Sequence, residues 1–439
     1  MAWGERKTGL FLAILCSLSY AGSYLGRLNY SAALPEMVSE HILTKTCGGL
    51  IATVYFASYG AGQLINGLLA DRGSPKVQVS VGMAGSAACN LLMYGVRFPP
   101  AMLVLWGLNG CAQSLIWAPA FLMVSRGIRG EYRAKALLLL NTAPSAGTIA
   151  SYLFSGAILH FMDWRALFLG ASLALAALLA VWLRGCGAVE RQLSGHQASI
   201  DGQGFGGSAP RPPAEGRRMG ISLLISSGAV LLIPPSMITG MLKDGITSWL
   251  PTYLAEEFSM SAGMAMIASV LLPLLHMAGA AAGYWLIRLL QNTAACAALL
   301  FFCTAGCAAL LSLAGALSPA ISILLFALIT AMMMAVSILF TSEAPSQFAG
   351  FGIAASVSGF FNGCGYAGAA ISMYGVASIA DSSGWGVVRI IWTAAALLAA
   401  VCAMAAVPLW KRAFPSDCLR EDRGQPACPC GPRERGRGD

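Results

Sequence analysis

Two stretches of the chain repeat one pattern. The chain reads YLGRLNYSAALPEM at residues 24–37 and MLKDGITSWLPTYL at residues 241–254. In each stretch a cation is followed by a hydroxyl residue at +4, by Leu at +7 and by Pro at +8. The matched residues are Arg27, Ser31, Leu34 and Pro35 in the first stretch, and Lys243, Thr247, Leu250 and Pro251 in the second. A second match supports duplication of half the chain, because Asn141, Gly147 and Trp164 share their spacing with Asn362, Gly368 and Trp385.

The composition excludes a soluble protein. Apolar residues make up 57% of the 439 residues and charged residues only 10%, whereas soluble proteins average about 45–50% apolar and roughly 25% charged. Twelve apolar stretches each approach or exceed the length of about 20 residues that a spanning helix needs. They are 9–34, 48–70, 77–96, 100–125, 136–160, 166–184, 220–254, 262–290, 293–315, 318–341, 350–380 and 386–410. The sequence therefore predicts an all-α polytopic membrane protein with twelve transmembrane helices.

The longest polar stretch between these spans divides them six and six. It covers 185–219, is rich in Gly, Ser, Pro and Arg, and has too little apolar surface to fold. We expect an N-terminal six-helix bundle over 1–184, a cytoplasmic linker over 185–219, a C-terminal bundle over 220–410 and a disordered cytoplasmic tail over 411–439. Two six-helix repeats related by an axis along the membrane normal are the architecture of the major facilitator superfamily, and we predict this 6+6 pseudo-symmetric fold.

The positive charge follows the predicted topology. The net charge is +8, but only four of the 27 Lys and Arg lie in predicted outside loops. These four are Lys45, Arg97, Arg165 and Arg389. An excess of Lys and Arg in cytoplasmic loops is the usual signature of orientation. We therefore expect both termini to be cytoplasmic, in a cell membrane of the bacterial plasma or inner-membrane type, and we expect no nucleic-acid partner.

Arg27 and Lys243 are the only basic residues placed well inside a predicted span. A central Arg or Lys costs about 2.5–3.5 kcal/mol on insertion scales, so such a residue persists where it faces a water-filled cavity or an anion. The alternatives are snorkelling to the headgroups and, for Lys243, pairing with Asp244. Adjacent residues on an α-helix point about 100° apart, so this pairing need not occur.

Polar stripes at helical spacing accompany Arg27. They consist of Tyr20, Tyr24, Arg27 and Ser31, of Tyr55, Tyr59, Gln63 and Asn66, and of Trp106, Asn109, Gln113 and Trp117. Hydrogen bonds between helices would explain one such stripe, while three of them beside an intramembrane Arg favour a polar central cavity. An Arg and a Lys together offer up to eight N–H donors, which suits phosphate or another oxyanion. Asp244 is the only carboxylate placed deep in a span, so a cationic substrate is not expected.

The loop between the second and third spans carries a further motif. Residues 67–76 read GLLADRGSPK, which matches the superfamily pattern Gly-x-x-x-Asp-Arg-x-x-x-Arg/Lys. Gly67 permits close helix packing, and Asp71 and Arg72 can form charge contacts that hold the cytoplasmic face closed. A plain tight turn is the alternative.

Motifs throughout most of the chain resemble the organophosphate:phosphate antiporters, which include glycerol phosphate, hexose phosphate and animal glucose 6-phosphate transporters. The resembling stretches are Tyr24-Leu25-x-Arg27-x-Asn29 with Pro35, Asn109-Gly110-x-x-Gln113 with Trp117 and Pro119, Leu242-Lys243-x-Gly245-Ile246-x-x-Trp249-x-Pro251-Thr252-Tyr253-Leu254, Glu343-Ala344-Pro345, and Gly359-Phe360-x-x-x-x-Gly365-Tyr366-x-Gly368. The resemblance implies that Arg27 and Lys243 hold a phosphate. It also implies that Tyr20, Tyr24, Tyr59 and Tyr366 line the pore. A helix 5 histidine and a second helix 1 cation of the glycerol phosphate members are replaced here by Pro144 and Leu28.

The predicted function is secondary active transport of a small organic anion, a phosphorylated metabolite exchanged for inorganic phosphate, by alternating access. The predicted substrate ligands are Arg27, Lys243, Tyr20, Tyr24, Tyr59, Tyr366, Asn29, Gln63, Asn109 and Gln113. Asp244 and His276 are candidates for coupling to protons, because His titrates near neutral pH. Two alternatives stay open: a membrane sensor of sugar phosphates, and a proton-coupled symporter of a non-phosphate organic anion. We expect a monomer in the lipid bilayer, no enzyme activity, no cofactor and no metal site, although Cys428 and Cys430 could bind a metal.

Overall fold

The computed structural model describes residues 2–69, 74–128, 131–194, 222–314, 317–348, 351 and 353–414. Helices joined by short turns make up this described part of the chain, and no strand occurs within it. Nine of its helical segments are long and apolar enough to cross a membrane. The prediction of an all-α polytopic membrane protein is confirmed.

The first half of the chain, up to residue 194, forms seven helices. They are α1 (Ala2–Ser23), α2 (Leu25–Ser39), α3 (Lys45–Leu69), α4 (Pro75–Gly95), α5 (Pro99–Gly127), α6 (Glu131–Phe161) and α7 (Arg165–Ser194). Pro begins α4 and α5 because the first turn of a helix needs no N–H donor and suits the fixed φ of Pro. Helix α7 continues to Ser194, ten residues into the stretch predicted to be a linker.

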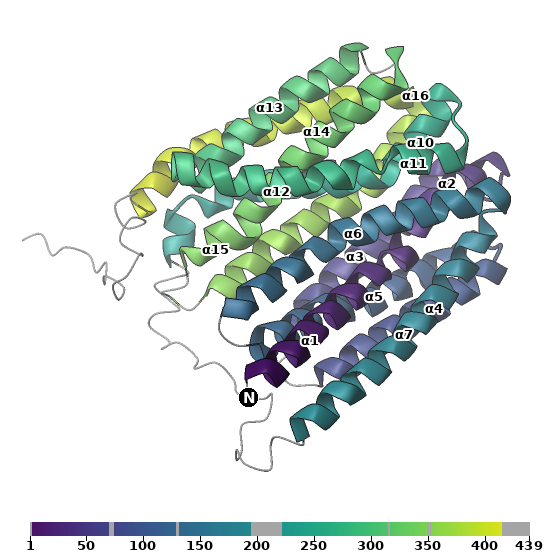
Figure 1. Cartoon of the computed structure of the whole chain (residues 1–439). Helices are drawn as coiled ribbons and strands as arrows, with labels where there is room; N and C mark the ends of the chain where they lie inside the picture. The colour runs from purple at the N-terminus through teal and green to yellow at the C-terminus, as the bar shows by residue number, and fades with distance from the viewer. Residues whose placement is uncertain are drawn as a thin grey trace, which may run out of the picture.

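The second half, from residue 222, contains more short elements. They are η2 (Ala229–Leu232), α9 (Ile233–Gly240), η3 (Met241–Gly245), α10 (Ile246–Phe258), α11 (Ala262–Ala268), α12 (Leu271–Leu290), α13 (Thr293–Ala314), α14 (Pro319–Ile338), η5 (Leu339–Glu343), α15 (Ala344–Ser346) and α16 (Ala354–Ala413). Figure 1 shows the helices of each half grouped together, with the two groups side by side.

Helix α16 contains two of the predicted spans. It is broken at Gly384, whose φ of 76° and ψ of 172° are not helical. Gly adopts this conformation without strain because it has no Cβ atom. Helices α3 and α4 have 25 and 21 residues, which is long enough to span a membrane. Neither is among the nine segments that are also apolar enough to cross it. The count of twelve therefore depends on dividing α16 at Gly384 and on including α3 and α4.

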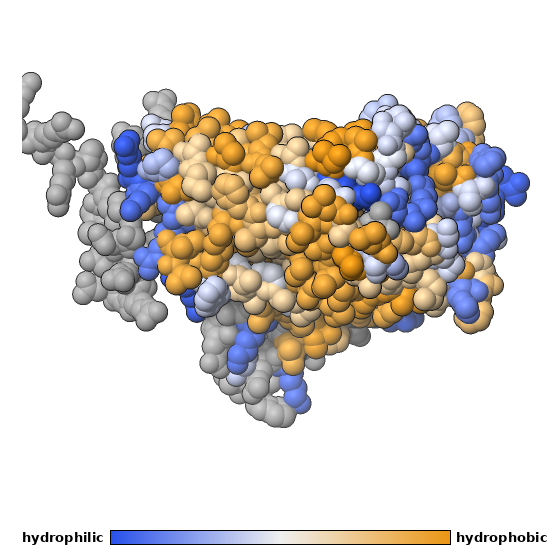
Figure 2. Space-filling model, turned by 90° about the horizontal axis from the view of Figure 1, so that it is seen from above, coloured by the Kyte–Doolittle hydropathy of each residue, from blue (hydrophilic) through white to orange (hydrophobic). Residues whose placement is uncertain are grey.

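An apolar band crosses the face of the molecule that Figure 2 shows. Figure 2 shows hydrophobic residues across the middle of the surface and hydrophilic residues gathered at both ends. The described ends of the chain lie at one end, which we call the terminal face (Figure 1). The turns at residues 40–44, 162–164 and 259–261 lie at the other end, which we call the distal face. By the positive-inside prediction, the terminal face is cytoplasmic.

Small residues let the two halves approach closely. Helix α3 of the first half packs on α16, where a methyl group added at Gly49 would meet Met373 and Ala377. Helix α6 packs on α11 through Gly156 and Gly263. Close approach at Gly is the usual way in which membrane helices associate.

Amide side chains fix the helix that carries Arg27. The helix is interrupted at Tyr24, between α1 and α2, and such a break frees backbone carbonyl groups. Gln113 donates to the carbonyl oxygen of Ser23 at 3.0 Å, and Asn109 donates to that of Gly26 at 2.8 Å. The hydroxyl of Ser86 in turn donates to Asn109 at 2.7 Å. These bonds from α4 and α5 hold the turn that precedes Arg27.

A π-helical turn carries Lys243. This turn, η3, follows Gly240, where α9 crosses α16 so closely that an added methyl group would overlap the carbonyl oxygen of Gly365. Gly368 makes the corresponding close approach to the carbonyl group of Met237. The crossing of α9 and α16 thus fixes the position of η3.

The substitution Gly240→Ala should lower the free energy of unfolding by about 1–3 kcal/mol, because overpacking forces the two helices apart. Thermal unfolding in detergent measures this effect. The matched control is Gly375→Ala, at a position with no atom near an added methyl group. Equal stability of the two variants would contradict the account of the crossing.

Replacing Asn109 with Ala should also destabilise the protein, by about 1–3 kcal/mol, because the buried Ser86 hydroxyl loses its acceptor and the Gly26 carbonyl oxygen loses the shorter of two side-chain hydrogen bonds. Asn141→Ala is the control, since the exposed Asn141 bonds only to Leu137 of its own helix. If both variants unfold at the temperature of the wild type, the amide network does not hold α2.

Candidate functional site

Arg27 is a buried cation among aromatic rings. Only 9% of the Arg27 surface is exposed. Its guanidinium carbon lies 4.9–5.7 Å from the ring centroids of Tyr24, Tyr55, Phe56 and Tyr59. Such contacts stabilise a cation through the negative faces of the rings. The guanidinium makes no hydrogen bond or ion pair with any residue that the structure describes, so its donors are available to an anion.

A small cavity adjoins Arg27. Residues of the first half form most of its lining, including Ser31, Tyr55 and Trp106, and Ser248 of α10 contributes from the second half. The two halves also meet where the Tyr152 hydroxyl donates to the Thr247 carbonyl oxygen at 2.9 Å. Arg27 therefore lies at the boundary between the halves.

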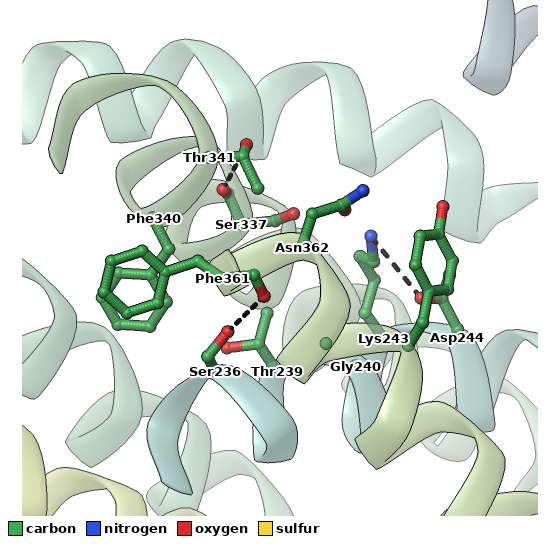
Figure 3. Close-up of a pocket in the computed structure, with 12 residues that line it drawn as sticks. Ser236, Thr239, Gly240, Lys243, Asp244, Ser337, Phe340, Thr341, Phe361 and Asn362 are labelled. Carbon is green, nitrogen blue, oxygen red and sulfur yellow. Dashed lines mark hydrogen bonds and ion pairs between the residues drawn. The ribbon is translucent and has the colours of Figure 1, made fainter. Parts of the chain in front are cut away.

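Lys243 has a different environment. Its Nζ lies 3.6 Å from a carboxylate oxygen of Asp244, as Figure 3 shows. The sequence left this pairing open, because adjacent residues on an α-helix point about 100° apart. The two side chains pair because a π-helical turn holds more residues than an α-helical one, so adjacent side chains project closer together. The pair leaves this part of the site with little net charge.

Lys243 and Asp244 line a second small cavity. Its other polar residues include Ser337, Thr341 and Asn362, and Tyr366 also lines it. The sequence analysis assigned no function to the first three. Two features of the sequence could have indicated these residues. Ser337 and Thr341 are spaced by four residues on one of the most apolar spans, and Asn362 belongs to the internal repeat.

Two tyrosines connect the surroundings of the two cations. The rings of Tyr59 and Tyr366 meet edge to face, with their centroids 5.0 Å apart. Tyr59 also contacts Arg27, and its hydroxyl accepts a hydrogen bond from Gln63 at 2.8 Å. Tyr20 lies beside them, with its ring 5.7 Å from that of Tyr24. The structure therefore brings the predicted tyrosines and Gln63 together with Arg27.

The other three predicted amide ligands lie elsewhere. Asn29 donates to Asn90 at 2.7 Å, and Asn109 and Gln113 belong to the network that holds α2. All three are buried within the first half and line neither of the two cavities described above. Their assignment as substrate ligands stays a prediction.

The remaining predicted residues fall in three places. His276 lies close enough to Lys243 and Asp244 for their charges to act on its ring, and its buried Nε2 has no hydrogen-bond partner among the described residues. Gly67 is in the last turn of α3. Asp71 and Arg72 lie outside the described residues.

An ion cluster joins the halves at the distal face. Lys45 of α3 lies 2.7 Å from Glu256 of α10 and 3.6 Å from Asp381 of α16. Asp381 also accepts the backbone N–H of Thr46 at 2.8 Å, and Glu256 accepts the indole N–H of Trp385 at 2.8 Å. The sequence predicts no function for these residues, which we call the distal cluster.

The internal repeat gives the distal cluster a counterpart. Glu40 follows Arg27 by the same 13 residues that separate Glu256 from Lys243. Glu40 likewise accepts an indole N–H, from Trp164 at 3.0 Å. It lies 3.9 Å from Arg165 of its own half, whereas Glu256 pairs with Lys45 of the other half. Glu40 thus forms its ion pair within one half, whereas Glu256 forms its ion pair between the halves.

The chain has known relatives. Its sequence is 31% identical over 156 residues to the membrane sensor protein UhpC of Escherichia coli strain K12, covering 34% of this chain and 34% of that protein. It is 26% identical to the glycerol-3-phosphate transporter of Bacillus subtilis strain 168, covering 38% of each. These matches span little more than a third of the relatives' length.

The fold matches solved transporters over most of the chain. A mutant of the peptide transporter POT superposes with a TM-score of 0.72 at 14% identity, covering 92% of this chain and 95% of that one. The family model of the Major Facilitator Superfamily matches residues 16–373. The chain belongs to the Major Facilitator Superfamily.

Proposed function

We propose that the protein is a secondary active transporter that exchanges a phosphorylated organic metabolite for inorganic phosphate by alternating access. One observation supports this proposal most strongly. The guanidinium of Arg27 is buried and has no counter-ion among the described residues. The cost of placing Arg at membrane depth is recovered when an anion binds it. A neutral substrate would leave that cost uncompensated.

Phosphate suits the site for geometric reasons. A guanidinium donates two parallel hydrogen bonds to two oxygens of one phosphate group, and the nearby Tyr24 and Tyr59 can donate from their hydroxyls. The similarity to a glycerol-3-phosphate transporter supports the same class, as do the sequence motifs around Arg27 and Lys243.

The unpaired charge of Arg27 in the empty protein favours exchange. Full closure around an empty site would remove the last water from an unpaired charge, which is strongly unfavourable. A bound anion lowers that cost. The loaded protein therefore changes conformation more readily than the empty one, which favours exchange over one-way flux.

The distal cluster supports alternating access. It joins the two halves at one face, so this conformation is closed there. Rocking of the halves would break these ion pairs and open the distal face. We further propose that both termini are cytoplasmic and that the protein is a monomer in the plasma membrane.

Two other functions are favoured by particular observations. The similarity to UhpC favours a sensor of sugar phosphates, which would bind ligand tightly and give little flux. The proximity of His276 to Asp244 favours proton-coupled symport. Uptake that needs a pH gradient and no internal phosphate would identify the symporter.

Replacing Arg27 should abolish exchange. In liposomes loaded with inorganic phosphate, Arg27→Ala should reduce uptake of labelled phosphate about a hundredfold, because it removes charge-assisted hydrogen bonds. Arg27→Lys should retain part of the activity, since Lys keeps the positive charge but cannot donate two parallel hydrogen bonds as a guanidinium does. The control is Arg97→Ala, which removes an exposed Arg between α4 and α5. Uptake at the wild-type rate by Arg27→Ala would refute the assignment.

Replacing Lys45 should loosen the distal face. In Lys45→Ala, amide hydrogen exchange at the start of α3 and the end of α10 should be about fivefold faster, since Glu256 and Asp381 lose their shared cation. Arg165→Ala is the matched control, because it removes an ion pair on the same face but within one half. Equal effects of the two variants, measured by mass spectrometry, would show that Lys45 does not hold the halves together.

A further inference from the structure

We propose that Asp244 is a proton-binding residue that sets the positive charge of the site. When Asp244 is deprotonated, its carboxylate neutralises Lys243, and Arg27 is the uncompensated cation of the two. When Asp244 is protonated, Lys243 adds a second positive charge that attracts the substrate anion. Anion binding is therefore accompanied by uptake of a proton. This inference rests on the proposed function and adds to it a regulation of the same site by pH.

The Lys243–Asp244 pair is held by charge alone. Its nitrogen and oxygen are 3.6 Å apart, which is longer than the roughly 2.7–2.9 Å of a charge-assisted hydrogen bond. By contrast, Glu256 of the distal cluster lies 2.7 Å from Lys45 and also accepts the indole N–H of Trp385. The Asp244 carboxylate accepts no hydrogen bond from any residue in the described part of the chain. Protonation of Asp244 therefore breaks no other bond.

The pair is open to the second cavity. The side chains of Lys243 and Asp244 are 21% and 23% exposed, and both line the cavity that Figure 3 shows. A proton that enters the cavity with water can therefore reach the carboxylate. At membrane depth a carboxylate is stable beside a cation or in its protonated form. Asp244 thus has two states that this site supports.

The elements around Asp244 supply few other groups that titrate. Besides Lys243, those within range of its charge are His276 of α12, Tyr366 of α16, Tyr152 of α6 and Tyr24 of α1. Helices α9 and α14 also pack against η3 and contain no titratable residue. The titratable residues of α10 are bonded to Lys45 and Arg389. Because tyrosine ordinarily keeps its proton well above neutral pH, Asp244 and His276 are the candidates among these groups for a change of charge.

The charge of Asp244 reaches the surroundings of Arg27. Tyr24 and Tyr366 lie within range of the charges of both residues, and the Tyr24 ring is 5.4 Å from the Arg27 guanidinium. Charges interact over longer distances in a protein interior than in water, because the effective dielectric constant is lower. The charge state of Asp244 therefore alters the attraction of an anion at Arg27 without any contact between Asp244 and that anion.

The internal repeat places this property in one half only. Leu28 follows Arg27, where Asp244 follows Lys243, and a guanidinium keeps its charge at every physiological pH. The first half thus has a permanent cation and the second half a cation whose compensation depends on a proton. Because binding effects are reciprocal, the anion favours protonation of Asp244 as much as protonation favours the anion. The proton enters and leaves with the anion, so the linkage is compatible with exchange.

The test counts the protons that are taken up with inorganic phosphate. Purified full-length protein is titrated with phosphate by calorimetry at one neutral pH, in buffers that differ in their enthalpy of ionisation. The wild type should take up about one proton more per bound phosphate than Asp244→Asn, because the variant has no carboxylate to protonate. Both proteins are compared at the same pH, so the titration of phosphate itself contributes equally to both.

The dissociation constants give a second readout, which the loss of a purely structural contact would not produce. Asp244→Asn leaves Lys243 uncompensated at every pH. It should therefore bind phosphate about tenfold more tightly than the wild type near pH 8, and this difference should shrink as the pH falls. Asp244→Glu should restore the wild-type behaviour. The matched control is Asp163→Asn, which removes an exposed carboxylate at the distal face and should change neither readout.

Lys243→Gln provides a second variant if Asp244→Asn fails to fold. Without its cation, Asp244 should already be protonated in the empty protein, so phosphate should again bind without the extra proton. Equal proton uptake by the wild type and both variants would overturn the inference. Loss of the extra proton in His276→Gln, with Asp244→Asn unchanged from the wild type, would also overturn it. Failure of the proposed function gives a different result, because the wild type would then bind no phosphate in any buffer.

Discussion

A positive charge with no counter-ion among the described residues is the constraint around which the centre of this molecule is arranged. Arg27 is held between the two halves by a ring of aromatic side chains. Its helix is held in turn by amides from α4 and α5 that satisfy the carbonyl groups at the break before it. The polar residues of the first half thus divide into those that position Arg27 and those that surround its free face.

Duplication of the chain did not produce two equal sites. Arg27 and Lys243 occupy the same position of the repeat, but the π-helical turn at Lys243 brings Asp244 into contact with it. Glu40 and Glu256 also correspond, and only Glu256 pairs across the boundary between the halves. These differences give one half the free charge and the other half the neutral polar cavity.

The sequence was sufficient for the fold class, because apolar length and the scarcity of charge are properties of each segment by itself. It also predicted that Tyr24 shares a helix face with Arg27, since spacing on one helix face is fixed by helical geometry, and the two side chains are in contact. It could not distinguish Asn109 and Gln113, which bind backbone carbonyl groups, from side chains that face a cavity, because both kinds recur at the same spacing. The pairing of Lys243 with Asp244 and of Lys45 with Glu256 depends on a local π-turn and on contacts between distant segments, neither of which has a signal in sequence spacing.

The most direct test of this account is a cryo-EM structure of the protein with a bound hexose 6-phosphate. The account predicts density for the phosphate group with two of its oxygens about 2.7–2.9 Å from the guanidinium nitrogens of Arg27. Phosphate density on Lys243 with Arg27 left unoccupied would contradict it.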